Sequence, residues 1–194
     1  MTVGEVMDAI IRDKRYYDVS GGGATLSGGE PMLQFDFTVA ILETCKKEGI
    51  NTALETCGVA REEQFKKILP LVDTFLYDIK ESDEALHKAY TGASNRLILK
   101  NLDYISARGA RIILRCPIIP GINDRTDHFE YIARLTIDTP GVEGAEIMPY
   151  HKLGTSKTAR MGFAEQELFE QPSENTVAGW NRAITKAGGK VMKY

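Results

Sequence analysis

Twelve residues near the start of the chain, SGGGATLSGGEP at positions 20–31, combine five glycines with a single carboxylate, that of Glu30. An ordered glycine loses more conformational entropy than any other residue, so such a stretch indicates either a turn or a backbone that a ligand approaches closely. A carboxylate beside bare backbone accepts strong, charge-assisted hydrogen bonds from an ammonium group. We therefore interpret Gly28-Gly29-Glu30 as a candidate amine-binding site, with a tight turn and a solvated Glu30 as the alternative. We expect residues 21–23 to form only the turn from a helix into a strand.

Three common glycine motifs do not fit this stretch. A phosphate-binding loop requires a lysine where the chain has Gly29. A dinucleotide-binding fingerprint starting at Gly21 requires glycine at position 26, where the chain has Leu26. The letters LSGGE also resemble the signature of ABC transporter ATPases, but GKS and GKT occur nowhere in the sequence. These observations argue against a nucleotide-phosphate site.

Segments typical of strands and helices alternate along nearly the whole chain. We predict strands at residues 24–27, 51–56, 72–80, 110–118 and 144–150, and a short final strand at 190–194. We predict helices at residues 3–17, 35–48, 61–69, 83–90, 95–108, 125–137 and 174–187. A capping box of Thr2 and Glu5 starts the first helix. Several strands are apolar throughout, as in sheets covered on both faces, so the predicted fold class is α/β with a parallel sheet, open or partly closed into a barrel.

Polar and ionisable residues follow the predicted strands, and ligands of parallel α/β folds bind beyond the carboxyl ends of the strands. A zwitterionic amino acid needs an acceptor for its ammonium group and a cation for its carboxylate, which Glu30 and Lys80 supply. Three of the polar residues near strand ends also have interpretations that involve no ligand. Lys80 suits a solvated strand end, His151 suits a surface or core histidine, and Arg115 suits an ion pair with a neighbouring helix.

Composition and charge exclude several classes of partner. The net charge of −3 and the isoelectric point near 5.7 lack the basic excess typical of nucleic-acid binding. No apolar run reaches the roughly 18 residues that a membrane helix needs, and the start of the chain lacks the pattern of a signal peptide. We expect a cytoplasmic protein whose 194 residues form one domain, 1–194, with neither nucleic acid nor membrane as a partner. Cys45, Cys57 and Cys116 form no CxxC or CxxxC cluster, so we expect three reduced thiols.

Six motifs, taken together and in order, resemble one family: SGGGATLSGGEPMLQ, ETCG, DIK, YTGASNRLILKNL, RCPIIPGIND and PYHKLGTSK. The chain resembles the glycyl-radical-enzyme activating enzymes, which are radical S-adenosylmethionine (SAM) proteins related to pyruvate formate-lyase activating enzyme. The resemblance covers about residues 3–194 and implies a partial (β/α)6 radical SAM-type barrel of parallel strands, with the first strand missing. It implies SAM cleavage by a [4Fe–4S] cluster, followed by hydrogen abstraction from a glycine loop of a glycyl radical enzyme. For the full-length family it also implies an electron donor such as flavodoxin or ferredoxin.

The resemblance implies roles for several residues at the amino-acid end of SAM. Backbone and carboxylate of Gly28, Gly29 and Glu30 would hold the methionine amino group, with Thr56 beside the methionine moiety. Lys80 would pair with the SAM carboxylate.

Further residues acquire roles from the same resemblance. Asp78 would hold the amino-acid end of SAM or a nearby cation. Glu55 stands where pyruvate formate-lyase activating enzyme has aspartate, and with Asp78 it would form a candidate monovalent cation site. His151 would contact the nucleoside of SAM, and Arg115 would face the active-site cavity as a catalytic residue.

The sequence departs from the family at the iron–sulfur motif, because CxxxCxxC occurs nowhere in this chain. The three cysteines stand in separate predicted elements, so we do not expect them to replace a contiguous loop of cluster ligands. We therefore expect this chain alone to be inactive. A shortened start, favoured by the helix that begins within three residues of Met1, and a natural cluster-free remnant both explain the departure. Two other functions stay open: a binding module that docks on a glycyl radical enzyme, and an unrelated α/β enzyme for a phosphorylated metabolite.

Overall fold

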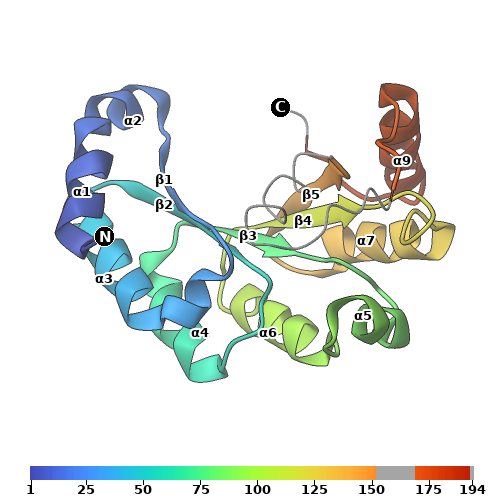
Figure 1. The fold of residues 1–194 in the computed structure, drawn as a ribbon, viewed down its shortest axis with the longest axis horizontal. Helices are drawn as coiled ribbons and strands as arrows, with labels where there is room; N and C mark the ends of the chain where they lie inside the picture. The colour runs from blue at the N-terminus through green and yellow to red at the C-terminus, as the bar shows by residue number, and fades with distance from the viewer. Residues whose placement is uncertain (152–168, 193–194) are drawn as a thin grey trace. The chain divides into compact units, whose positions relative to one another are not determined.

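Five strands form one sheet in the computed structural model, which describes residues 1–151 and 169–192 (Figure 1). The strands follow the order of the chain: β1 (Gly23–Leu26), β2 (Asn51–Thr56), β3 (Thr74–Asp78), β4 (Ile112–Ile118) and β5 (Val142–Pro149). The α-helices are α1 (Val3–Arg12), α2 (Lys14–Ser20), α3 (Phe35–Lys47), α4 (Glu62–Ile68), α5 (Glu84–Thr91), α6 (Arg96–Ser106), α7 (Thr126–Asp138) and α9 (Glu174–Lys186). Two 3₁₀-helices are η1 (Pro31–Gln34) and η2 (Leu69–Leu71).

The chain divides into two compact units. Unit 1 comprises Met1–Asp78, Asn95–Ile113 and Thr139–Val142, and unit 2 comprises Ile79–Ser94, Leu114–Asp138 and Glu143–Tyr194. The prediction of a single domain over residues 1–194 stays a prediction.

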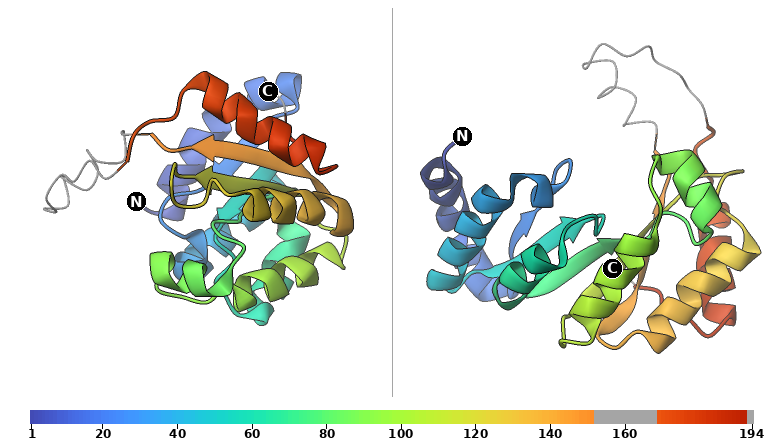
Figure 2. Two further views of the ribbon diagram at one scale, coloured as in Figure 1. Left: turned by 90° about the vertical axis from the view of Figure 1, so that its right-hand side faces the viewer. Right: turned by 90° about the horizontal axis from the view of Figure 1, so that it is seen from below.

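In unit 1 the strands β1, β2 and β3 are parallel, with Leu26 opposite Leu54 and Thr56 opposite Tyr77. Helix α3 packs against β2, and α4 packs against α3 and α6 (Figure 2). Burial alternates along β2 and β3, so that Leu54 and Tyr77 are fully buried while Glu55 is half-buried. One face of β2 and β3 is therefore buried, and the other face is only partly buried.

The first predicted helix is divided in two. The capping box is confirmed: the Thr2 N–H donates to Glu5 Oε2 at 2.7 Å, and the Glu5 N–H donates to Thr2 Oγ1 at 3.3 Å. Helix α1 then ends at Arg12, and the next residue, Asp13, has a φ of −93° and a ψ of 2° that interrupt the helix before α2. The left-handed cap of helix α2 is Gly21, with a φ of +68°, so Gly21 and Gly22 form the predicted turn, while Gly23 is already the first residue of β1.

Unit 2 packs its helices α7 and α9 against each other. The rings of Phe129 and Trp180 lie 6.5 Å apart, and a Cβ at Gly189 would come within 2.7 Å of the backbone of Ala133. Instead of the predicted strand 190–194, Val191 forms a single parallel bridge with Ala145, and residues 193–194 lie outside the described part. No helix in the described ranges is both long and apolar enough to cross a membrane.

Gly58 lies in a crowded turn that follows β2. Its φ is +76°, and a Cβ there would clash with the hydroxyl of buried Tyr77, which donates to the Ile98 carbonyl at 2.7 Å. We expect Gly58→Ala to lower the free energy of unfolding by about 3 kcal/mol, since steric overlap adds to the left-handed backbone. Gly49→Ala is the matched control: Gly49 has a φ of +66° but open surroundings, and we expect a loss of about 1 kcal/mol. Equal losses in urea unfolding would contradict the role of the Tyr77 contact.

Candidate functional site

The carboxylate of Glu30 is anchored by three hydrogen-bond donors in unit 1. Its Oε1 accepts from the Met32 N–H at 3.0 Å and from the Thr56 hydroxyl at 2.9 Å. Its Oε2 accepts from the Cys57 N–H at 2.8 Å. The alternative of a tight turn with a solvated Glu30 therefore does not describe this residue. The structure brings the predicted residues Glu30 and Thr56 together, at the ends of β1 and β2.

Gly28 and Gly29 shape the chain between β1 and Glu30. Their φ angles are +95° and +54°, which glycine adopts without steric cost. No heavy atom lies within 4 Å of a Cβ built at either residue. The backbone conformation, and not crowding by the protein, therefore requires glycine here, and the space beside this backbone is open to a ligand.

A buried amide supports the turn that holds Glu30. Asn101 of α6 is fully buried, and its Nδ2 donates to the carbonyls of Gly58 and Ala60, both at 2.8 Å. The Gly58 N–H in turn donates to Thr56 Oγ1 at 3.1 Å. A chain of hydrogen bonds thus runs from α6 through the turn after β2 to Glu30. We did not predict this role from sequence, where its signal is one asparagine within the otherwise apolar pattern of a helix.

Glu55 and Asp78 belong to the half-buried face of β2 and β3. Glu55 lies opposite Leu76, and Asp78 follows two residues later on the same face. Oε2 of Glu55 accepts from the Ser27 hydroxyl at 2.5 Å. The candidate cation site formed by Glu55 and Asp78 stays a prediction.

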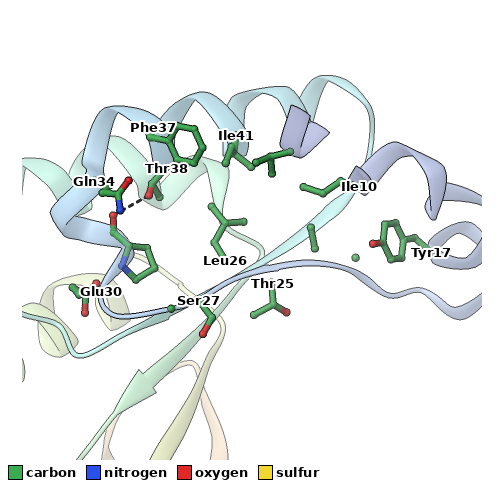
Figure 3. A pocket seen from close by; sticks show the side chains of 15 residues that line it. Ile10, Tyr17, Thr25, Leu26, Ser27, Glu30, Gln34, Phe37, Thr38 and Ile41 are labelled. Atoms are coloured by element: carbon green, nitrogen blue, oxygen red, sulfur yellow. Dashed lines mark hydrogen bonds between the residues drawn. The ribbon is translucent and has the colours of Figure 1, made fainter. Parts of the chain in front are cut away.

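A groove of about 430 Å³ lies in unit 1 between α1, β1 and α3 (Figure 3). Figure 3 shows Glu30 at one end and Tyr17 at the other, with Ile10, Leu26 and Ile41 along its length. The lining is mainly apolar, which does not suit a zwitterionic amino acid. Only the end that carries Gly28 and Glu30 belongs to the predicted SAM residues.

In unit 2 the backbone beside Lys80 is held from two sides. The Lys80 carbonyl accepts from Nδ2 of Asn123 at 2.8 Å. The next residue, Glu81, is buried and accepts from Nη1 and Nη2 of Arg125, both at 2.9 Å. The Asp83 N–H also donates to Glu81 at 3.0 Å. The role of the Lys80 side chain stays a prediction, with a solvated strand end as the alternative.

Glu81 and ionisable groups around it have shifted pKa values. Burial alone would raise the pKa of Glu81, but hydrogen bonds from Arg125 and the Asp83 N–H outweigh burial and lower it to about 2. The hydrogen bonds to Glu81 and then to Asp127 raise the pKa of Arg125. Burial lowers the pKa of His128, whose Nδ1 accepts from the Ser82 N–H at 3.2 Å. Glu81 and Arg125 therefore form a charged pair beside a neutral histidine.

Arg115 of β4 is paired with a strand and not with a helix. Its Nε lies 3.0 Å from Oε2 of Glu146 on β5 and donates to Sδ of Met148 at 3.0 Å. Glu146 was missed in the sequence, where its signal is the one carboxylate in the otherwise apolar predicted strand 144–150. His151 is exposed just after β5, and residues 152–168, which include most of the motif PYHKLGTSK, lie outside the described residues.

Comparison with known proteins now places these residues in a family. The model of the radical SAM superfamily matches residues 1–136. The chain belongs to the radical SAM superfamily. The pyruvate formate-lyase 1-activating enzyme of Escherichia coli (strain K12) is 32% identical over 196 residues, which cover 99% of this chain and 79% of that enzyme. Within the radical SAM superfamily, the chain is therefore a member of the glycyl-radical-enzyme activating enzymes, and the predicted resemblance is confirmed.

Two other relatives of this radical SAM chain are activating enzymes. The choline trimethylamine-lyase activating enzyme of Oleidesulfovibrio alaskensis is 37% identical over 197 residues, covering 100% of this chain and 61% of the relative. The trans-4-hydroxy-L-proline dehydratase activating enzyme of Clostridioides difficile is 37% identical over 197 residues, covering 97% and 65%. The chain thus spans less than two thirds of the length of these two relatives. Membership in this family overturns the alternative of an unrelated α/β enzyme.

Solved structures confirm the predicted fold class of a partial radical SAM barrel. A domain of pyruvate-formate lyase-activating enzyme from Bacteroides vulgatus has a TM-score of 0.72 at 27% identity, covering 88% of this chain and 98% of that chain. A radical SAM methyltransferase from Sphaerobacter thermophilus has a TM-score of 0.73 at 16% identity, covering 99% and 57%, and this likeness concerns the fold alone.

The cysteines of this chain do not fit the [4Fe–4S] cluster that the radical SAM family uses together with SAM. Cys45 is buried on α3, Cys116 is buried on β4, and Cys57 is half-buried after β2. In the ranges that the structure describes, no group of three or more His, Cys, Asp or Glu residues is arranged to hold a metal ion. We therefore derive no step through the cluster from these residues.

The Glu81–Arg125 pair predicts a distinct acid sensitivity. Because the folded protein lowers the pKa of Glu81 from 4.5 to about 2, the pair contributes stability above pH 4.5 that is lost as the pH falls towards 2. We expect wild type to lose about 3 kcal/mol more than Glu81→Gln across this range in urea unfolding, an order-of-magnitude figure. Glu62→Gln is the control, since the Glu62–Lys100 pair is exposed and should contribute little. The same pH dependence in wild type and Glu81→Gln would contradict the assignment.

Proposed function

We propose that this chain is the SAM-binding core of an activating enzyme, which generates a glycyl radical on a partner enzyme related to pyruvate formate-lyase. The observation that carries the proposal is the Glu30 carboxylate, held by three donors beside the open backbone of Gly28 and Gly29. An anchored carboxylate requires no reorganisation to receive an ammonium group, so this arrangement favours an α-amino acid ligand.

Unit 1 supplies the groups for the ammonium end of SAM in this proposal. Oε2 of Glu30 accepts from one protein donor, the Cys57 N–H, and keeps a second lone pair for the ligand ammonium. Thr56 acts mainly through Glu30, because its buried hydroxyl donates to that carboxylate. Glu55 and Asp78 are proposed to bind a monovalent cation near the amino-acid end.

Unit 2 supplies the remaining roles. Lys80 is proposed to pair with the SAM carboxylate, and His151 to contact the nucleoside. Arg115 is proposed as the catalytic residue that faces the cavity, and its guanidinium is oriented by Glu146, 3.0 Å away. An arginine held by a carboxylate presents its remaining N–H groups in a defined direction.

The partner proposed for the activating enzyme is the glycine loop of a glycyl radical enzyme. The names of the relatives refer to activation of choline trimethylamine-lyase, trans-4-hydroxy-L-proline dehydratase and pyruvate formate-lyase. A flavodoxin or ferredoxin as electron donor and a cytoplasmic location belong to the same proposal. A second candidate, a cluster-free module that docks on the glycyl radical enzyme, is favoured by the three cysteines, which do not fit a cluster.

Calorimetric titration with SAM tests the proposed site. We expect Glu30→Gln to weaken SAM binding about tenfold, because it removes the charge that the ammonium group meets. Glu48→Gln, at an exposed residue after α3, is the matched control and should bind as wild type does. No effect of Glu30→Gln would remove Glu30 from the site, and no binding of SAM to wild type would favour the docking module.

Electron paramagnetic resonance tests the prediction that this chain alone is inactive. The chain is incubated with SAM, a reductant and pyruvate formate-lyase, and we expect no glycyl radical signal because its cysteines do not fit a cluster. The Escherichia coli relative, treated in the same way, is the positive control. A glycyl radical doublet produced by this chain would overturn the prediction.

A further inference from the structure

We propose that Asn123 is a positioning residue that fixes the backbone carrying Lys80. Asn123 belongs to the loop that follows β4 and is almost completely buried. The assignment of the SAM carboxylate as the ligand of Lys80 rests on the proposed function. The hold on the backbone rests on the geometry alone.

Asn123 satisfies three backbone groups with one side chain. Its Nδ2 donates to the carbonyls of Lys80 and Pro117, both at 2.8 Å, and its Oδ1 accepts from the Ile119 N–H at 2.8 Å. Asparagine is the shortest side chain with two amide donors and a carbonyl acceptor. Aspartate offers only acceptors when ionised, and serine offers a single donor, so neither replaces all three bonds.

One of these three bonds goes beyond what the loop itself needs. The bonds to Pro117 and Ile119 close the loop after β4, within six residues of Asn123. The bond to Lys80 spans 43 residues of sequence. The amide therefore ties the segment that follows β3 to the loop that follows β4.

The neighbours of Lys80 are held as well. Before it, the Ile79 N–H donates to the Arg115 carbonyl at 2.8 Å, as strands in a sheet do. After it, Glu81 is held by Arg125, which also donates to the Ile122 carbonyl at 3.0 Å. The Lys80 side chain therefore starts from a fixed backbone at the end of β3. A fixed origin reduces the conformational entropy that the site loses when a ligand binds.

The affinities of Asn123 variants for two ligands show whether Asn123 positions Lys80 or only stabilises the whole fold. SAM carries the α-carboxylate that Lys80 would meet, and decarboxylated SAM lacks only this group. We expect Asn123→Asp to weaken SAM binding about tenfold in calorimetry and to leave the affinity for decarboxylated SAM unchanged. Asn123→Ala is the second variant, should Asn123→Asp fail to fold. Asn101→Asp is the control: it disturbs the turn that holds Glu30 and should weaken both ligands, since both carry the ammonium group.

A lysine variant separates failure of this inference from failure of the proposed function. In a Lys80→Met background, Asn123→Asp should have no further effect on SAM affinity. A persisting effect, or equal weakening of both ligands, would overturn the positioning role. If Lys80→Met binds SAM as wild type does, the proposed contact of Lys80 with SAM fails.

Amide hydrogen exchange tests the hold itself without any ligand. We expect the amides of Glu81 and Ser82 to exchange at least several-fold faster in Asn123→Asp than in wild type, while those of β2 stay unchanged. Unchanged exchange at Glu81 and Ser82 would overturn the inference, even if SAM binds to the wild-type chain. Faster exchange in a chain that binds no SAM would support the hold and reject the proposed ligand.

Discussion

The hydrogen bonds to the Glu30 carboxylate are the interaction on which the candidate site of unit 1 depends. A half-buried carboxylate is stable only when donors replace the water that it has lost. Here the donors are the Met32 N–H, the Thr56 hydroxyl and the Cys57 N–H. They connect the segment after β1 to the turn after β2, so these two segments hold each other in position. Asn101 and Tyr77 support the same turn from α6 and β3.

In unit 2 the polar groups of the segment after β3 also have side-chain partners, but these partners are an amide and a guanidinium. The polar groups of the backbone after β3 need partners. Asn123 supplies a neutral amide, and Arg125 supplies a charged partner for buried Glu81. A buried carboxylate without its arginine would be costly, so this pair constrains the segment strongly. In both units a buried side chain holds a loop at the carboxyl end of a strand, where the ligand residues are proposed to lie.

This chain contains the residues proposed to bind SAM, but its cysteines do not fit the iron–sulfur cluster of the family. The chain belongs to the glycyl-radical-enzyme activating enzymes and contains the glycine–glutamate motif and the strand ends proposed for SAM. Its cysteines stand on separate elements, where they serve as apolar or half-buried groups and do not form a cluster site in the described ranges.

The sequence by itself determined the family, the α/β fold and the approximate bounds of the strands and helices. These features depend on local information, namely side-chain periodicity, capping residues such as Thr2, and glycines such as Gly21 that end a helix. The glycines and the carboxylate of Gly28, Gly29 and Glu30 predicted an amine-binding site, and the order of the motifs predicted SAM as its ligand. The interruption of the first helix at Asp13 was not predicted, because neither glycine nor proline stands beside that residue to mark a helix end.

Only the tertiary structure decided which partners these residues have. Glu30 meets donors 26 and 27 residues away, and Asn123 meets Lys80 across 43 residues. Arg115 pairs with Glu146 of a neighbouring strand, where the sequence suggested a helix as the alternative. Strand register and helix packing bring such groups within hydrogen-bond distance, and neither is written in the local pattern of one segment. The physical reason is that a buried polar group takes whichever partner the packed chain places beside it.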